Sequence, residues 1–416
     1  MKSLLRKHLP SIDTQIWILV AGRFLSEVGT GFTLFYAPIF FVNQIGLSAT
    51  SFGIALSSNA ISGVVGRVLG GSLADSQFWS RRRTLLLSAG ICAIGSLVLA
   101  ATNNFVTLVI ANLINGLGVG LYWPSTEAFV ADFTNNENCR EAFAITRFAD
   151  NLGLALGIVL AGALVAKTAS YRLLFIIDSL SFILFFVVIY VFLKQTHHQA
   201  TATLNVKKQQ AASWIAALSD KRLLIFIVVN IIFTTYISQL HSTLPLYFKN
   251  FIQVDEVNKG LLETTISALF TWHLIVAIIA QLPLARFMKP LSNSFTLTIS
   301  ALLWAIGFSC ILATGILSSY SIVYPVLALF LFALAIVSYT PSASALVSDI
   351  APTDKRGIYF SLNSLCWAVG NFIGPPLGGW ALDQSRFFIN TFWLSLSASI
   401  IVTIVILLYL QRLLSN

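Results

Sequence analysis

The chain has 416 residues, of which 57% are hydrophobic and 10% charged, whereas an ordinary soluble domain carries about 25% charged residues. A water-soluble fold has too little interior to bury so much apolar surface. Apolar stretches long enough to cross a hydrocarbon core of about 30 Å recur along the whole chain, which indicates an integral membrane protein. The formal net charge of +9 would suit nucleic acid, but the positive residues lie where they would orient membrane helices, so no nucleic-acid partner is expected.

The first apolar run, residues 16–42, is far longer than the core of a cleavable signal peptide, and we expect it to remain as a helix. The four cysteines lie in or beside apolar segments, without the spacing of a metal site. We therefore expect free thiols, no metal and no cofactor.

Twelve membrane-spanning helices are predicted, with both ends of each uncertain by a few residues. The first six are 16–42, 52–74, 84–101, 105–130, 144–166 and 173–193, and the second six are 223–248, 261–282, 295–315, 321–348, 358–382 and 387–411. The polar segment 194–222 separates them. The predicted fold is all-α, with an N-terminal six-helix bundle (1–193), a linker (194–222) and a C-terminal six-helix bundle (223–416).

Lysine and arginine in the short loops predict the orientation in the membrane. Seventeen lie on the side of the termini and the linker, against five on the other side, namely Lys167, Arg172, Lys249, Lys259 and Arg386. We therefore expect both termini and the linker to be cytoplasmic, in a multi-pass protein of the cell (inner) membrane.

The two predicted bundles repeat each other. At a constant offset of 217 residues, the segment 122–132 aligns with 339–349 and matches at Tyr, Pro, Ser, Ala, Val and Asp. The same offset places Gly153 and Gly157 on Gly370 and Gly374. Two equivalent halves are a transporter architecture with a solute site near the midplane between them.

The loop after the second predicted helix carries a motif that begins at Gly71, continues with Asp75 and ends in Arg81, Arg82 and Arg83. It resembles the G-x-x-x-D-x-x-G-R-R loop of the major facilitator superfamily, although the arginines lie two residues later than usual and phenylalanine replaces the second glycine. The resemblance covers essentially the whole chain. It implies a twelve-helix transporter of two pseudo-symmetric bundles.

By this resemblance, Asp75 would lie near the N-terminus of helix 11, where a carboxylate meets the positive end of a helix dipole. It would stabilise the outward-open state, and Asp132 with the loop arginines would complete a cytoplasmic gate. The alternative is that Arg81, Arg82 and Arg83 only fix the orientation of the chain.

Helix 11 contains Gly370, Gly374 and Gly378 around a Pro-Pro pair, whereas the matching Gly153 and Gly157 in helix 5 have no proline. Exporters of the family typically carry the G-P-x-x-G-G form in helix 5. Here the proline-containing form lies in helix 11 instead, so this motif supports an efflux permease less strongly. The alternative is that these glycines let helices of the two halves approach closely.

Charged residues inside the spans are the best guide to chemistry, because each costs at least about 2.5 to 3.5 kcal/mol to insert. Arg23 and Glu27 are four residues apart and share one helix face, with Glu27 about 15 Å from the start of its helix. Glu27 is a candidate for binding a proton or the solute, because its protonation could change when the conformation alters its contact with Arg23. The alternative is a structural ion pair between the two.

Glu127, Arg147 and Asp150 lie within about two turns of the cytoplasmic ends of helices 4 and 5. They are candidates for coupling, with a salt-bridge cluster that stabilises the gate as the alternative. His273 lies near the middle of helix 8 and could relay protons, although a packed, hydrogen-bonded histidine is the commoner case.

The function favoured by these patterns is secondary active transport of a small organic solute by alternating access, in the form of proton-coupled export. Uptake of a solute is the alternative within this class. A non-transporting receptor or sensor is the alternative of another class. No phosphate-binding G-x-x-x-x-G-K-[ST] loop, H-E-x-x-H or G-x-S-x-G motif occurs, so neither an ATP-driven pump nor an enzyme is expected. We expect a monomer that contacts membrane lipids, the solute and protons.

Overall fold

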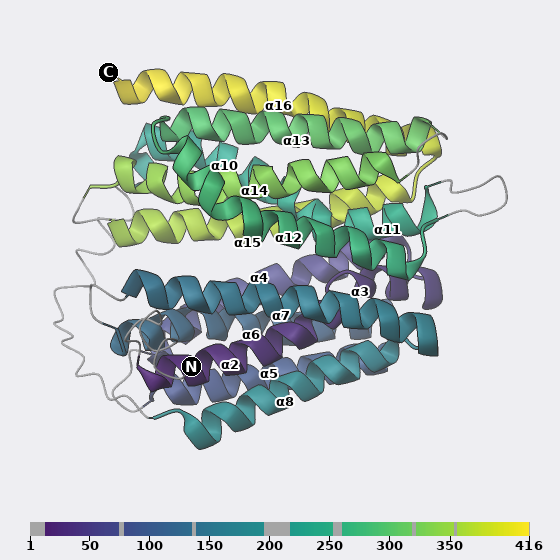
Figure 1. Cartoon of the computed structure of the whole chain (residues 1–416), viewed down its shortest axis with the longest axis vertical. Coiled ribbons are helices and arrows are strands. Elements are labelled where there is room, and N and C mark those ends of the chain that lie inside the picture. Colours follow the sequence, from purple (N-terminus) through teal and green to yellow (C-terminus); the bar gives the residue numbers. More distant parts are fainter. Residues whose placement is uncertain are drawn as a thin grey trace, which may run out of the picture. The chain divides into compact units, whose positions relative to one another are not determined.

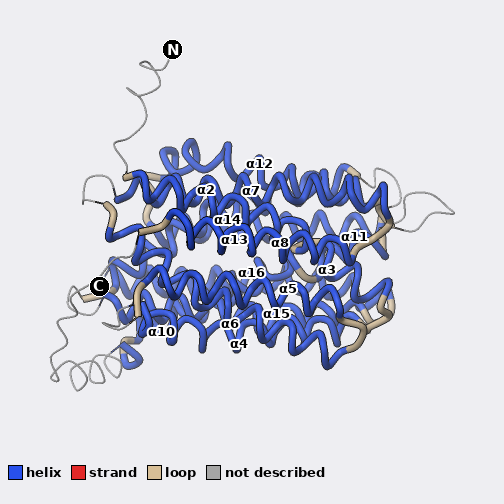
Figure 2. The backbone as a smooth tube through the Cα atoms, turned by 90° about the horizontal axis from the view of Figure 1, so that it is seen from below, coloured by secondary structure: helices blue, strands red, loops and turns tan. Residues whose placement is uncertain are grey.

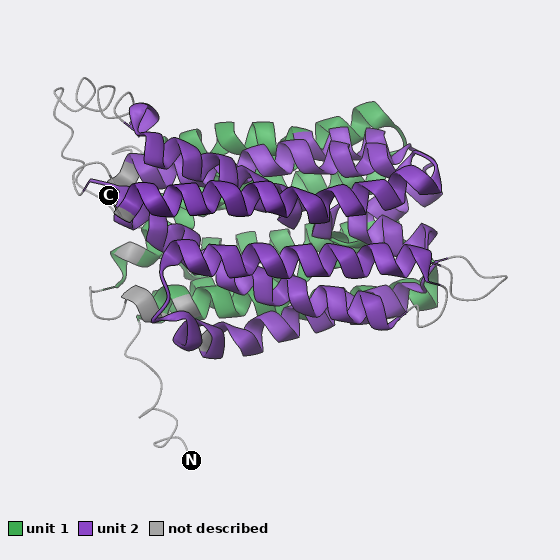
Figure 3. Cartoon of the chain, turned by 90° about the horizontal axis from the view of Figure 1, so that it is seen from above, with its two compact units in different colours: residues 1–36, 58–201 green, residues 37–57, 202–416 purple. Residues whose placement is uncertain are grey.

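The computed structural model describes residues 13–74, 79–134, 139–194, 217–252, 260–317, 322–352 and 356–415. Within these ranges the chain is helical and has no strand (Figure 1, Figure 2). It divides into two compact units, coloured separately in Figure 3. Unit 1 comprises Met1–Tyr36 and Ser58–Thr201, and unit 2 comprises Ala37–Ser57 and Ala202–Asn416.

The helices of the N-terminal sequence half begin at Thr14 and end at Phe192. They are α2 (Thr14–Thr33), α3 (Tyr36–Ile39), η1 (Phe40–Gln44), α4 (Ala49–Ala74), α5 (Arg81–Ala101), α6 (Phe105–Asp132), α7 (Cys139–Thr168) and α8 (Arg172–Phe192). In unit 1, α2 packs on α7 and α8, while α5 packs on α6 and α8. The helix α4 begins in unit 2 and ends in unit 1.

The helices of the C-terminal sequence half all belong to unit 2. They are α10 (Lys221–His241), α11 (Thr243–Asn250), α12 (Glu263–Met288), α13 (Asn293–Ile316), α14 (Val323–Ile350), α15 (Arg356–Leu382) and α16 (Arg386–Ser415). Here α10 packs on α15, α12 on α14, and α13 on α14 and α16.

Several helices begin where a side chain accepts a hydrogen bond from a free backbone N–H of the first turn. Asp13 accepts from the N–H of Gln15 at 2.7 Å and begins α2. Asp220 does the same for α10, accepting from the N–H of Arg222 at 2.9 Å. These caps lie one residue before each helix, so polar loop residues determine where the apolar segments begin.

Eleven helices of the described chain are long and apolar enough to cross a membrane. The predicted span 358–382 matches α15, which is not among the eleven because it is rich in glycine, proline and small polar residues. Large apolar side chains on α8 and α16, such as Tyr190, Val191, Ile401 and Val405, are exposed. In a multi-pass membrane protein such side chains face lipid.

Two predicted spans are each broken into two helices. The predicted helix 16–42 is interrupted after Thr33, and the predicted helix 223–248 is interrupted at Ser242. Pro38 and Pro245 follow these breaks by a few residues, and proline has no N–H with which to continue the hydrogen-bond ladder of the preceding helix. An offset of 207 residues separates the two prolines, so the break is part of the repeat.

The glycines of α7 let it approach α2 within unit 1. A Cβ added at Gly157 would lie 2.1 Å from the carbonyl oxygen of Val28 and 2.9 Å from Cα of Gly31. A Cβ at Gly153 would lie 2.5 Å from the carbonyl oxygen of Phe24. Only glycine fits such contacts, because any larger residue would push the two backbones apart.

The equivalent glycines of α15 serve the same purpose within unit 2. A Cβ at Gly370 would lie 2.3 Å from Oγ1 of Thr234, and one at Gly374 would lie 1.7 Å from Oγ of Ser238. These four glycines pack within their own sequence half. A Cβ at Gly379, in the same motif of α15, would instead lie 2.2 Å from the carbonyl oxygen of Ala49 on α4, so the expected close approach between helices of the two halves is found at that glycine. Each named pair packs against the first helix of its own half, because the contact with that helix is what the repeat preserves. The remaining predicted glycine, Gly378, packs against Thr243 of α11, also in unit 2.

A capping contact in unit 2 also joins the two sequence halves. Asp383, directly after α15, accepts hydrogen bonds from the backbone N–H of Ala49 at 2.9 Å and of Thr50 at 2.8 Å. The hydroxyl of Thr50 donates to the same carboxylate at 2.6 Å. Asp383 therefore caps the N-terminus of α4 and places a negative charge at the positive end of its dipole.

Candidate functional site

A buried ion pair links α2 to α7 in unit 1. Nε of Arg23 donates to Oδ1 of Asp150 at 2.8 Å, and its second terminal nitrogen donates to Oδ2. The Arg23 side chain is 3% exposed. Its guanidinium carbon also lies 5.3 Å from the ring centre of Tyr122 and 5.5 Å from that of Trp123, both on α6. Two-point hydrogen bonding and aromatic faces suit a guanidinium that must be held out of water.

Glu27 lies one turn beyond Arg23 on α2, as the sequence spacing predicted. Among the described residues, its carboxylate makes no hydrogen bond or salt bridge. Arg23 turns instead to Asp150, which the sequence had placed with Glu127 and Arg147. The predicted alternative of an Arg23–Glu27 structural pair is therefore wrong, because α7 comes close enough at Gly153 to supply the better-placed carboxylate.

The same helix junction in unit 2 is built without charge. An offset of 207 residues relates Arg23 to Asn230 on α10, and the offset of 217 relates Tyr122 to Tyr339. The amide of Asn230 donates to Oδ1 of Asn363 on α15 at 2.7 Å, and the hydroxyl of Tyr339 donates to Asn230. Because neutral groups hold this junction together in unit 2, its architecture does not require the ion pair of unit 1.

Glu27, like Arg23, has an uncharged counterpart in the other repeat. Its counterpart at the offset of 207 residues is Thr234, whose hydroxyl donates to the carbonyl oxygen of Cys366 at 2.9 Å. One repeat therefore carries a small, satisfied hydroxyl where the other carries a carboxylate. Charges that cost free energy inside a span and that the repeat does not need are candidates for function.

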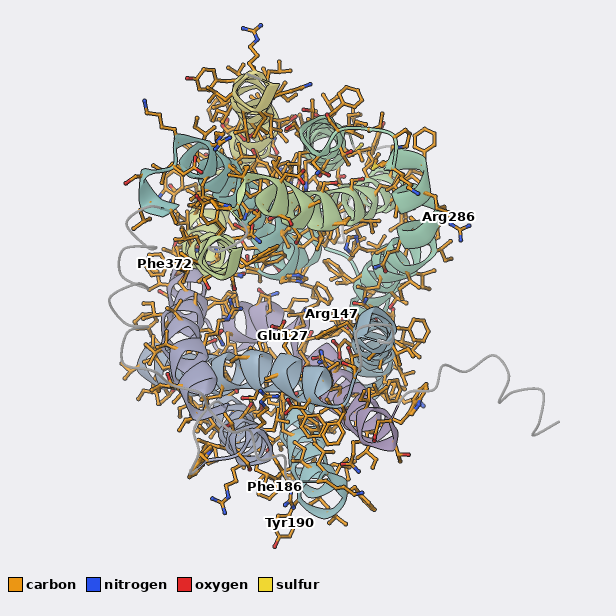
Figure 4. All side chains as sticks on the ribbon, turned by 90° about the vertical axis from the view of Figure 1, so that its left-hand side faces the viewer. Glu127, Arg147, Phe186, Tyr190, Arg286 and Phe372 are labelled. Atoms are coloured by element: carbon orange, nitrogen blue, oxygen red, sulfur yellow. The ribbon has the colours of Figure 1, made fainter. Side chains whose placement is uncertain are left out.

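Glu127 and Arg147 form a second, looser pair on the same unit. Their charged atoms are 3.9 Å apart, the guanidinium of Arg147 lies 4.5 Å from the ring centre of Trp123, and both side chains are more than half exposed. Figure 4 shows the two side by side, whereas Phe186 and Tyr190 project from α8 at the far rim of the unit. Exposed charges within spans face water rather than lipid, so this surface of α6 and α7 is the polar one.

The predicted cytoplasmic gate is described only in part. Asp75 lies outside the described residues, and a Cβ at Gly71 would contact nothing within 4 Å. Arg81 forms a salt bridge with Asp132, so the first residue of α5 binds the last residue of α6. Arg82 instead donates to the carbonyl oxygen of Ile189 at 3.3 Å near the end of α8.

His273 is buried in α12, and its Nδ1 lies 2.9 Å from the carbonyl oxygen of Leu329 on α14. It is a packed, hydrogen-bonded histidine in this conformation. The structure does not bring it together with the charged residues of unit 1, since it belongs to unit 2.

Asp178 is a buried charge that the sequence reasoning missed. It is the single charged residue of the predicted span 173–193, and its side chain is 4% exposed in α8. The hydroxyl of Ser96 on α5 donates to its Oδ2 at 2.7 Å. A lone acid six residues inside an apolar span was a sufficient signal, and it was overlooked because it has no charged neighbour in sequence.

Repeated helices, charged groups within membrane spans and a polar face on one unit together define a multi-pass membrane transport protein. The sequence profile of the Major Facilitator Superfamily matches residues 19–262 and 257–414. The chain belongs to this family, as the resemblance predicted.

Two relatives match this chain over most of both lengths. The chain is 24% identical over 392 residues to a Na(+), Li(+), K(+)/H(+) antiporter of Planococcus maritimus, covering 87% of this chain and 89% of that protein. It is 21% identical over 373 residues to the quinolone resistance protein NorA of Staphylococcus aureus strain MSSA476, covering 89% and 91%.

Solved structures show the same fold. The nucleoside transporter NupG matches with a TM-score of 0.81 at 15% identity, over 96% of this chain and all of that chain. A peptide transporter, POT, in complex with sulfate matches with a TM-score of 0.79 at 18% identity, over the whole of this chain and 98% of that chain.

Proposed function

We propose that the protein exports a small solute in exchange for protons by alternating access, with Glu27 as the proton-binding group. The observation that carries this proposal is the contrast between the repeats: Glu27 stands without a hydrogen-bond partner among the described residues, where the other repeat has a satisfied Thr234. A carboxylate that can gain and lose a proton couples proton binding to a conformational change when the two conformations solvate it differently.

The ion pair of Arg23 with Asp150 holds α2 against α7 one helix turn from Glu27. Glu27 interacts electrostatically with both members of the pair and with Arg147. A change in protonation at Glu27 therefore alters the charge balance across the α2–α7 contact. The exposed Glu127 and Arg147 beside Trp123 would offer a solute charged groups and an aromatic face.

Export in exchange for a cation agrees with the printed names of two relatives, an antiporter and a quinolone resistance protein. These names also supply the first probes, namely a fluoroquinolone and the ions Na⁺ and K⁺. We propose that both termini are cytoplasmic, which the bias of Lys and Arg in the loops supports. We propose a monomer in the cell membrane.

The test is Glu27→Gln reconstituted in proteoliposomes that contain a pH-sensitive dye. In the wild type, a fluoroquinolone, Na⁺ or K⁺ added against an imposed pH gradient should move protons. We expect Glu27→Gln to abolish this pH-driven movement and to retain exchange of labelled for unlabelled solute, because exchange needs no net proton transfer.

Glu263→Gln is the matched control, because it makes the same chemical change at another site. Glu263 lies at the start of α12 and pairs with Lys249 at 2.6 Å. It should keep pH-driven transport. Full pH-driven accumulation by Glu27→Gln would show that Glu27 is not the coupling group, and Asp150 would become the next candidate. A wild type that binds the probes but moves neither them nor protons would favour the receptor alternative.

A further inference from the structure

The carboxyl group of Asp178 is held in the interior of unit 1 with half of its hydrogen-bonding capacity unused. Oδ2 accepts from Ser96, whereas Oδ1 is buried and has no hydrogen-bond partner among the described residues. The proposed coupling through Glu27 does not use this group. An ionised carboxylate in hydrocarbon with an unsatisfied oxygen is costly, so the group needs a reason to remain.

Asp178 lies at nearly the same depth along α2 as Glu27. A Cβ added at Gly29 of α2 would lie 2.9 Å from Oδ1 of Asp178, so the unsatisfied oxygen faces α2 two residues beyond Glu27. Two residues of helix correspond to about 3 Å of rise and about 200° of rotation, so Glu27 and Gly29 are close in depth but lie on different sides of α2. Glu27 and Asp178 interact electrostatically, and both also interact with the buried thiol of Cys92 on α5.

Three carboxyl groups lie at successive depths along α2. Asp150 lies at the level of Arg23, Glu27 follows one turn later, and Asp178 lies beside Gly29. α8 begins at Arg172, on the side of the membrane that is poor in Lys and Arg, and Asp178 lies about 9 Å inside it. Of these three carboxyl groups, Asp178 is thus the one nearest that side, which the charge bias assigns to the cell exterior.

Among the described residues, no cation forms a salt bridge with Asp178. The charged and titratable side chains that face it are Glu27 from α2 and Cys92 from α5. The nearest buried cation on α2 is Arg23, which lies one turn before Glu27 and is therefore farther from Asp178. It is bound to Asp150. Among the described residues there is also no cluster of three or more His, Cys, Asp and Glu side chains suited to a metal ion.

We infer that Asp178 is a second proton-binding carboxyl group, which receives protons from the outer side and supplies them to Glu27. A proton from bulk water binds to Oδ1 of Asp178, and the neutral acid then releases it through water to the ionised Glu27. Asp178 is left as the anion, stabilised by the hydrogen bond from Ser96, until another proton arrives. Neither step needs a further reactant. This inference rests on the proposed coupling through Glu27.

The first test is spectroscopic and needs no solute. Infrared difference spectra of the purified protein in H₂O and D₂O, recorded across a pH titration, report the carbonyl stretch of protonated carboxylic acids. We expect a titrating band that Asp178→Asn removes and that Glu27→Gln leaves in place. Ser96→Ala should move this band, because it removes the hydrogen bond to Oδ2.

The second test is transport by the same proteoliposomes. Asp178→Asn should slow pH-driven solute movement at least tenfold and keep solute exchange, while Ser96→Ala should keep the maximum rate and move the midpoint of its pH profile. Ser179→Ala is the matched control. Ser179 neighbours Asp178 but donates to the carbonyl oxygen of Ala93 at 2.9 Å, so its loss should move neither readout.

The outcomes separate this inference from the proposed function. Loss of pH-driven transport in Glu27→Gln, with wild-type rates and an unchanged infrared band in Asp178→Asn, would overturn the role of Asp178 alone. Wild-type transport in Glu27→Gln would overturn the proposed function, while the infrared band would still decide whether Asp178 binds a proton. If Asp178→Asn does not fold, an unshifted band in Ser96→Ala overturns the inference.

Discussion

At the scale of single residues, spacing along one helix could be predicted and partners on other helices could not. The four-residue interval correctly placed Arg23 and Glu27 on one face of α2. The true partner of Arg23, Asp150, lies 127 residues away in sequence. Its approach depends on Gly153 and on the aromatic face of α6, neither of which a one-helix pattern reveals.

The Arg23–Asp150 pair makes a prediction about stability. Arg23→Gln leaves the carboxylate of Asp150 buried and without its partner, so we expect it to lower the free energy of unfolding by about 3 to 5 kcal/mol. The double variant Arg23→Gln/Asp150→Asn should recover much of this loss, because amides pair as neutral groups in the way Asn230 and Asn363 do. Thermal or denaturant unfolding of the purified variants measures the coupling.

The exposed pair provides the comparison. Arg147→Gln removes a cation whose partner, Glu127, is 3.9 Å away and more than half exposed, and exposed pairs contribute about 0 to 1 kcal/mol. Equal losses from Arg23→Gln and Arg147→Gln would mean that burial of the Arg23 pair does not strengthen it.

At the scale of helices, length and apolarity predicted where the chain crosses the membrane. They did not predict the breaks before Pro38 and Pro245 as separate helices, because a window of hydropathy is insensitive to one missing N–H. They also could not assign the partners of the glycines. A glycine shows that a close neighbour is allowed, but the identity of that neighbour depends on the tertiary fold.

Gly157→Ala tests the contact between α2 and α7. The added Cβ would lie 2.1 Å from the carbonyl oxygen of Val28, which is backbone and cannot rotate away. We expect a loss of about 1 to 3 kcal/mol of stability, the usual range for overpacking. Gly90→Ala in α5 is the control, since its Cβ would meet nothing within 4 Å. Its melting temperature should equal or slightly exceed that of the wild type, and a similar loss in both variants would contradict the close approach.

At the scale of the whole molecule, the internal repeat predicts a six-helix bundle in each sequence half, and this division remains a prediction. The compact units of the structure group residues 37–57 with unit 2. The sequence pattern assigns these residues to the first half because they connect helices 1 and 2. The cap of α4 by Asp383 and the contact of Gly53 with Pro375 involve residues more than 300 positions apart, which no local pattern reports.

This cap leads to a prediction about alternating access. Asp383 belongs to the C-terminal sequence half and α4 to the N-terminal half, so opening on the side poor in Lys and Arg must break their three hydrogen bonds. A helix cap contributes about 1 kcal/mol, which corresponds to about a fivefold shift between two conformations. Asp383→Ala should therefore favour the conformation that is open on this side.

Labelling of a buried position measures the shift. Ser57 is buried two turns along α4, where its hydroxyl donates to the carbonyl oxygen of Phe372 at 2.7 Å. Three native cysteines, Cys92, Cys310 and Cys366, are buried, so only the fourth, Cys139, is replaced by serine in the background that carries Ser57→Cys. In this background, a membrane-impermeant maleimide should react about fivefold faster when Asp383→Ala is added. Asp220→Ala is the matched control, since Asp220 caps α10. Its other hydrogen bond in the described part of the chain, from the hydroxyl of Tyr359 on α15, also stays within the C-terminal half. Its labelling rate should stay unchanged, because that cap does not distinguish the two conformations. An unchanged rate in Asp383→Ala would reduce Asp383 to a local helix cap, whereas an equal acceleration in both variants would indicate general loosening rather than opening.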